Sequence, residues 1–203
     1  TLTRTTDIVS LCFNTLSPFG NFHNLIGVPL TLLRIEQNHE WAILELGMNR
    51  PGEIRRLSQI CSPDIGLITN IGPAHLQGLG SLEGIMNAKG EMLEMLSSKS
   101  KLVLNADDAM VMRLAKRSPC KPTLFGLTEN ADIRASALET SMDAVSFQLH
   151  THEGDIQVSL PVPGEFNVSN ALAAAAVGYC LKIPLSEIKT GLGSFMPVKG
   201  RMN

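Results

Sequence analysis

The chain has 203 residues, of which 44% are hydrophobic and 18% charged, and its formal net charge is −2 at pH 7. This length allows one large α/β domain or two small ones, with a substantial hydrophobic core. The small net charge excludes a general attraction to nucleic acid or to an anionic membrane, so any bound phosphate must be held by local contacts.

The spacing of the cysteines indicates a reducing compartment, and the short apolar runs give no sign of a membrane span. The four cysteines are widely spaced, with no C-x-x-C pair and no Cys/His cluster at zinc spacing. No run approaches about 18 apolar residues, and no signal peptide is visible. We therefore expect a cytoplasmic protein. Because Thr1 is followed by residues typical of a helix interior, we also expect the chain to be part of a longer protein.

The first half of the chain alternates helical and strand-like segments. Hydrophobic periodicity predicts helices over residues 1–16, 27–36, 51–61 and 81–97, and strands over residues 41–47, 64–72 and 100–107. This alternation indicates an α/β fold, with a mostly parallel sheet that carries helices on both faces.

The second part changes character. Residues 131–138, 144–152 and 155–162 alternate apolar and polar side chains and are separated by turn residues, which predicts a small antiparallel sheet attached to the parallel one. Residues 167–183 and 184–195 then read as two closing helices.

One lysine lies on the wrong side of the helix predicted over residues 81–97. At about 100° per residue, Lys89 falls within an apolar stripe. That stripe comprises Ile85, Met92, Leu93 and Leu96, and the opposite side carries Asn87, Glu91 and Glu94. Lys89 either extends its ammonium group past the core to water or points into a functional site.

Two predicted strands end near side chains that could bind a ligand or a metal ion. Glu45 closes the strand at 41–47, and His75 follows the strand at 64–72 after a Gly-Pro turn. Open α/β sheets place ligands at the carboxyl ends of their strands. Taken alone, Glu45 could equally be a solvated strand end, and His75 could cap the next segment.

Two asparagines precede an alanine-rich helical run. Asn167 could serve as the helix N-cap. Asn170 lies three residues further on the same face, and paired amides suit the donor and acceptor edge of a base such as adenine.

Six stretches together resemble the central ATP-binding domain of the Mur ligases. They occur in family order over nearly the whole chain and are GNFHNLIGVPLTLL, AILELGMNRPGEI, LITNIGPAHLQGLGSLEGIMNAKGEM, LVLNADD, PGEFNVSNALAAAAVG and PVKGR. The resemblance implies a P-loop-type central domain over residues 1–196, followed at 197–203 by the start of a connector to another domain.

The resemblance also implies an activity. Mur ligases use ATP and Mg²⁺ to join an amino group to a carboxylate through an acyl phosphate. The motifs favour the branch that adds D-alanyl-D-alanine to UDP-N-acetylmuramoyl-tripeptide during peptidoglycan synthesis. Both substrates would be bound through further domains, and no nucleic acid or membrane partner is implied.

By this resemblance, Glu45, His75 and Lys89 form the catalytic set, with Glu45 and His75 holding magnesium. Lys89 matches a lysine that is carbamylated in related ligases and could then hold a second magnesium ion. Burial favours carbamylation because it lowers a lysine pKa and supplies the neutral amine. Thr1 matches the threonine after the lysine of the phosphate-binding loop, and would contact the nucleotide and its metal.

The implied nucleotide and substrate contacts lie elsewhere. Asn167 and Asn170 would face the adenine, and Arg201 would reach a phosphate from the connector. Asn24, before the predicted helix at 27–36, would line the substrate side of the cleft.

The chain departs from the family at two places. It opens TLTRTT where the family has a loop ending in Gly-Lys-Thr, so we expect this fragment alone to be inactive. His23 stands where the D-alanyl-D-alanine ligases have a second asparagine. The alternatives are another ligase of the superfamily, adding a diamino acid to a muramoyl dipeptide or glutamate to folate, or a non-catalytic nucleotide-binding homologue.

Overall fold

The computed structural model describes residues 1–18, 22–73 and 76–194. The helices are α1 (Leu2–Val9), α2 (Gly27–Leu32), α3 (Glu53–Cys61), α4 (Leu76–Leu79), α5 (Leu82–Gly90), α6 (Ala109–Ala115), α7 (Glu165–Cys180), α8 (Leu185–Gly193) and the 3₁₀ helix η1 (Glu91–Met95). The strands are β1 (Thr15–Leu16), β2 (Trp41–Ala42), β3 (Ile65–Ile68), β4 (Lys101–Asn105), β5 (Pro122–Gly126), β6 (Ile133–Thr140), β7 (Val145–Thr151) and β8 (Gly154–Leu160). Within these ranges no helix is long and apolar enough to cross a membrane.

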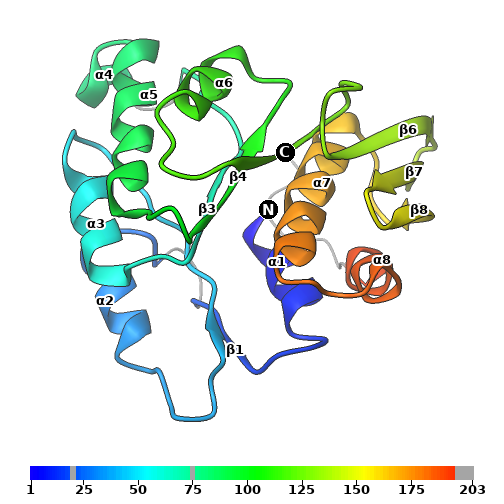
Figure 1. Cartoon of the computed structure of the whole chain (residues 1–203), viewed down its shortest axis with the longest axis horizontal. Coiled ribbons are helices and arrows are strands. Elements are labelled where there is room, and N and C mark those ends of the chain that lie inside the picture. The colour runs from blue at the N-terminus through cyan, green and yellow to red at the C-terminus, as the bar shows by residue number, and fades with distance from the viewer. Residues whose placement is uncertain (19–21, 74–75, 195–203) are drawn as a thin grey trace.

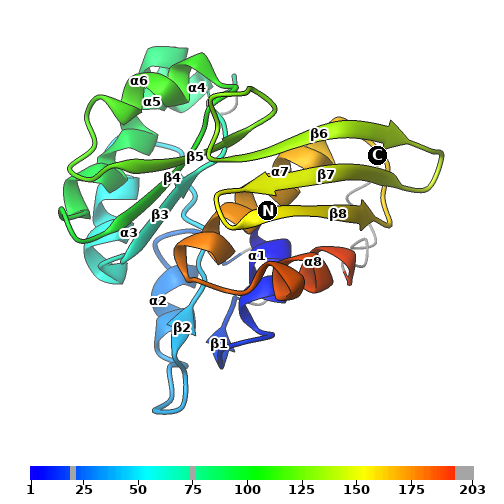
Figure 2. The same ribbon diagram turned by 45° about the vertical axis from the view of Figure 1, so that its right-hand side comes forward.

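The main sheet has six strands in the order β3-β4-β5-β6-β7-β8. Its first three pairings are parallel, and the pairings of β6 with β7 and of β7 with β8 are antiparallel. This confirms the predicted α/β fold. The antiparallel strands continue the parallel sheet and extend it away from β5 (Figure 2).

Helices cover both faces of the parallel strands, as Figure 1 shows. Along β4, Val103 packs into the core on the side of α7, whereas Leu102 and Leu104 pack into the core on the side of α5. This alternation follows from the two-residue period of a strand. The alanine run of α7 is buried against the sheet, and α1 and α8 lie on the same side.

The predicted first helix and the strand after it differ from the structure. The helix ends at Val9, and Thr15 and Leu16 pair in parallel with Trp41 and Ala42 as a separate two-stranded sheet. Residues 43–47 continue β2 without being assigned as strand, although the Ile43 amide still donates to the Leu16 carbonyl over 2.8 Å. The expected strand over 41–47 is therefore paired only at its start.

Four short elements were absent from the sequence prediction: β1, α4, α6 and β5. The helices α4 and α6 span only four and seven residues, which is too short to show a clear hydrophobic period. The two residues of β1 lie within the predicted first helix, and β5 begins at Pro122. The helix predicted over 81–97 also divides into α5 and η1 at Gly90.

Candidate active site

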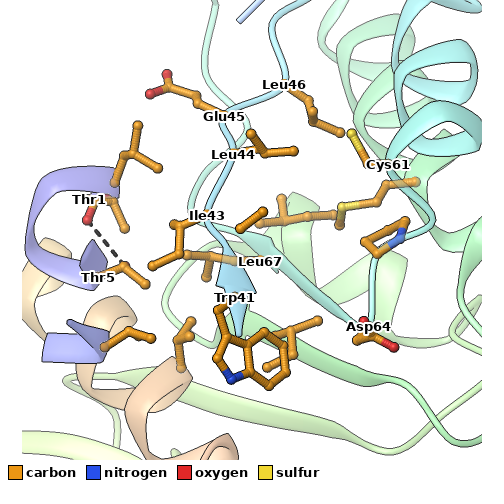
Figure 3. A pocket seen from close by; sticks show the side chains of 18 of the residues that line it. Thr1, Thr5, Trp41, Ile43, Leu44, Glu45, Leu46, Cys61, Asp64 and Leu67 are labelled. Carbon is orange, nitrogen blue, oxygen red and sulfur yellow. Dashed lines mark hydrogen bonds between the residues drawn. The ribbon is translucent and has the colours of Figure 1, made fainter. Parts of the chain in front are cut away.

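A cavity of about 680 Å³ runs between α1, the segment 41–46 and β3. Figure 3 shows Thr1 and Glu45 near one end and Trp41 and Asp64 near the other. Asn70 and Lys89 also line the cavity. Glu45 and Asn70 follow the two strands and line the cavity at their carboxyl ends, where parallel sheets place ligands. Glu40 and Asp64, in contrast, line it at the amino ends.

Thr1 and Glu45 reach the cavity from different elements. Glu45 lies on the extended segment after β2, and its side chain is exposed. Thr1 is the N-cap residue of α1 and is half-buried. The cavity therefore combines a solvent-accessible carboxylate with a hydroxyl group at a helix N-terminus, where the backbone dipole favours an anion.

Lys89, near the end of α5, directs its ammonium group to the loop that follows β3. Its Nζ atom donates a 2.6 Å hydrogen bond to the Asn70 carbonyl oxygen. Burial lowers the pKa of Lys89, and the nearby Asp108 carboxylate opposes that shift. Desolvation is the larger of the two effects, so the neutral amine is easier to form here than in water.

The two residues after Lys89 have structural contacts. A Cβ atom at Gly90 would lie 2.8 Å from a methyl group of Leu114, so a side chain here would displace Leu114 where α5 meets α6. Glu91, predicted on the solvent side, is instead buried. Its carboxylate accepts the amides of Gly52 and Arg55 at 2.7 and 3.0 Å and thereby caps α3.

The asparagines of α7 are engaged within the protein. Asn167 is buried, accepts from the Arg4 guanidinium at 2.9 Å and donates to the Pro163 carbonyl at 2.6 Å. The N-cap of α7 is Gly164, so the capping interpretation of Asn167 is wrong. Asn170 accepts a hydrogen bond from the Thr1 hydroxyl. Neither asparagine lines the cavity, and their contact with adenine stays a prediction.

Three other predicted residues lie apart from this cavity or beyond what is described. His75 and Arg201 lie outside the described residues. The Asn24 side chain accepts the amides of Ile26 and Gly27 at 3.0 and 2.8 Å and so caps α2. Its role on the substrate side of a cleft is untested.

The described side chains suit a magnesium ion that is shared with phosphate. Among the described residues, no group of three or more His, Cys, Asp or Glu side chains could enclose a metal. Magnesium, however, is usually bound by one or two carboxylates, water and substrate phosphates. Glu45 offers such a carboxylate, and Thr1 offers a hydroxyl oxygen in the same cavity.

Sequence reasoning missed the contacts of the segment Asn105–Asp108. Asn105, Asp107 and Asp108 each bond to the backbone of a neighbouring segment. The stretch LVLNADD contributes to the family resemblance, which assigns no role to its polar residues. Their position directly after a buried strand is the signal that could have identified them.

Comparison with known proteins agrees with this geometry. Residues 2–178 match the family model described as the Mur ligase middle domain. The UDP-N-acetylmuramoyl-tripeptide--D-alanyl-D-alanine ligase of Buchnera aphidicola subsp. Baizongia pistaciae is 40% identical over 199 residues, which cover 98% of this chain and 43% of the relative.

Solved structures of Mur ligases are also similar to this chain. A crystal structure of MurF from Acinetobacter baumannii superposes with a TM-score of 0.94 at 34% identity, covering 100% of this chain and 45% of that one. MurF ligase from Thermotoga maritima in complex with ADP shares the fold, with a TM-score of 0.84, 22% identity and coverage of 99% and 46%. The chain thus spans less than half the length of these relatives.

Proposed function

This chain belongs to the Mur ligase middle-domain family, and from that premise we propose that it is the ATP-binding part of an amide ligase. The complete enzyme would add D-alanyl-D-alanine to UDP-N-acetylmuramoyl-tripeptide in the cytoplasm. The name of the Buchnera relative supports this substrate assignment. The ADP complex of the Thermotoga relative supports ATP as the nucleotide.

The observation that carries the proposal is the polar lining of the cavity. Thr1, Glu45, Asn70 and Lys89 line it from four separate segments of the chain. A carboxylate, a desolvated lysine and a helix N-terminus in one cavity suit the transfer of a phosphoryl group between two anions. A purely structural lysine would have no need of a polar cavity.

The proposed reaction has two steps. A carboxylate oxygen of the tripeptide attacks the γ-phosphorus of ATP, the bond to the bridging oxygen breaks, and ADP leaves. The amino group of D-alanyl-D-alanine then attacks the acyl carbon, loses a proton, and inorganic phosphate leaves with the acyl oxygen. In both steps the chain contributes positioning and charge neutralisation rather than covalent chemistry.

Each cavity residue has a part in this proposal. The first amides of α1 and the Thr1 hydroxyl face the nucleotide phosphates. The Glu45 carboxylate and the Thr1 hydroxyl would hold magnesium, which supplies positive charge next to the phosphate oxygens. His75 is proposed as a further ligand by family resemblance, Asn167 and Asn170 as adenine contacts, Arg201 as a phosphate contact and Asn24 as a substrate contact.

Lys89 is proposed to react with carbon dioxide. The ammonium group first loses one proton, and the neutral amine then forms an N–C bond with carbon dioxide and loses a second proton, so that a cation becomes a carbamate anion. One N–H remains on the nitrogen and can still donate to the Asn70 carbonyl, which now accepts from Nζ. The new carboxylate would then extend into the cavity and would hold a second magnesium ion.

The test is phosphate release by the full-length protein. We expect release that requires ATP, the muramoyl tripeptide and D-alanyl-D-alanine together. Glu45→Gln should lower kcat by at least about 100-fold and leave thermal stability nearly unchanged, because its exposed carboxylate contributes little to the core. Equal rates with a diamino acid, or with glutamate and folate, would assign the chain to another branch, and nucleotide binding without turnover would contradict the proposal.

A further inference from the structure

The segment Asn105–Asp108 connects the carboxyl end of β4 with the strands on both sides of it. Asn105 is buried; its Nδ2 atom donates to the Thr69 carbonyl over 2.9 Å, and its Oδ1 atom accepts the Asp107 amide over 2.9 Å. Thr69 is the first residue after β3. Asn105 therefore holds the loop after β3 against the loop after β4.

Asp108 makes a second connection to the same loop. One carboxylate oxygen accepts the amides of Met110 and Val111 at 2.9 and 3.0 Å, which caps α6. The other oxygen accepts the Ile71 amide at 2.7 Å. A single side chain thus fixes both the start of α6 and the loop after β3.

Three consecutive residues of that loop are each held by a different side chain. Asn105 bonds to the Thr69 carbonyl, Lys89 to the Asn70 carbonyl and Asp108 to the Ile71 amide. Because the peptide bond is planar, fixing the backbone groups on both sides of Asn70 restricts where its carbonyl can point. That carbonyl is the hydrogen-bond acceptor for Lys89.

We infer that Asp108 and Asn105 are positioning residues for Lys89: by orienting the Asn70 carbonyl, they determine where the Lys89 nitrogen lies in the cavity. The expected effect on catalysis rests on the proposed function, whereas the expected position of the Lys89 nitrogen does not. Neither residue lines the cavity, so both act through the loop rather than on a substrate.

Asp107 provides a matched control in the same segment. Its carboxylate accepts the amides of Leu127 and Thr128 at 2.7 and 3.1 Å. Those amides follow β5, on the side of β4 away from β3. Asp107 therefore makes the same kind of contact as Asp108 with the opposite neighbouring strand, and among the described residues it has no bond to residues 69–73 of the loop that holds Lys89.

The variants are chosen to keep the protein folded. Asp108→Ser retains a good helix N-cap for α6 but is too short to keep the bond to Ile71 as well. Asn105→Ala removes the bond to Thr69 without changing any charge. Asp107→Ser removes a comparable pair of bonds on the other side. Amide hydrogen exchange at Ile71, Met110 and Leu127 in the full-length protein reports which bonds each variant has lost.

The first readout is the rate at which acetic anhydride acylates Lys89 in the full-length protein, measured by mass spectrometry. We expect Asp108→Ser and Asn105→Ala both to raise this rate severalfold, and Asp107→Ser to leave it unchanged. An increase in Asp108→Ser alone would mean that the lost negative charge is responsible, and would overturn the inference. An unchanged rate in both variants would overturn it too. This readout needs no ligase activity.

The second readout is steady-state kinetics. A displaced lysine should lower kcat by about 10- to 100-fold in Asp108→Ser and Asn105→Ala, with the KM for ATP within about twofold of wild type. Asp107→Ser should retain wild-type kcat. If Lys89 acylation rises while kcat stays unchanged, the catalytic consequence is wrong. If the wild-type protein has no ligase activity, the proposed function fails, and the acylation rates still decide the positioning.

Discussion

At the scale of single residues, the direction of Lys89 could be predicted and its partner could not. Helical periodicity places Lys89 among apolar side chains from its own sequence alone. The Asn70 carbonyl that it bonds lies on a loop 19 residues earlier, and only the packing of α5 beside β3 brings the two together. Bonds of Asn105 and Asp108 to that loop depend on strand order in the same way.

Replacing Lys89 tests its proposed carbamylation. In the full-length protein, Lys89→Ala should lower kcat by at least about 100-fold, because both the carbamate and its metal contact are lost. Short-chain carboxylic acids should partly restore the activity by supplying a carboxylate in the vacated space. Wild-type kcat, or a loss explained wholly by a lower unfolding temperature, would contradict this role.

A second residue-scale prediction concerns Cys61, which lines the cavity. Burial raises its pKa to about 11. At pH 8 about a thousandth of this thiol is ionised, so iodoacetamide should alkylate exposed Cys12 first and Cys61 only slowly. Its rate should rise with pH up to about 11. Peptide mapping after timed alkylation measures both rates, and equally fast labelling of Cys61 at pH 8 would refute the prediction.

The raised pKa of Cys61 also makes the stability of the folded protein depend on pH. The folded thiol keeps its proton up to about pH 11, whereas in the unfolded chain it ionises near its ordinary pKa of 9.0. Cys61 therefore contributes stability that is fully present below pH 9.0 and is lost as the pH rises through about 11.

At the scale of elements, the sequence predicted segments that are apolar and buried along most of their length. The strand ending at Asn105 and the alanine-rich α7 were both recognisable. Glu91 shows the limit of the method, because a helical projection treats every carboxylate as solvent-facing, whereas α3 supplies two backbone amides that satisfy this one. A cap contributed by another element leaves no periodic signal.

Glu91 and Glu94 give a matched test of that contact. Glu91→Gln keeps one acceptor oxygen and places an amide donor against a backbone N–H, so it should destabilise α3 by about 1–2 kcal/mol. Glu94→Gln loses only an exposed ion pair with Arg55 and should cost at most about 1 kcal/mol. Hydrogen exchange of the α3 amides measures both effects, and equal protection in the two variants would show that Glu91 is not a significant cap.

At the scale of the whole molecule, the fold assembles one polar cavity from segments distant in sequence. Thr1, Glu45 and Lys89 line this cavity from α1, the segment after β2 and α5. The relatives are more than twice as long as this chain, which covers 43% of the Buchnera ligase and 45% of the Acinetobacter structure. In the proposed reaction, which consumes ATP and joins two other substrates, the described residues therefore account for only part of the enzyme.

The last prediction follows from the fraction of its relatives' length that this chain covers. The 203-residue chain alone should show no phosphate release that depends on both the muramoyl tripeptide and D-alanyl-D-alanine. In the proposed mechanism the activation barrier falls mainly because the enzyme holds the three substrates together in reacting geometry. A chain that binds only some of these substrates loses that advantage. The full-length protein, assayed in parallel at equal concentration, should release phosphate, and circular dichroism should verify that the isolated chain is folded. Substrate-dependent release by the isolated chain would show that these residues hold all three substrates.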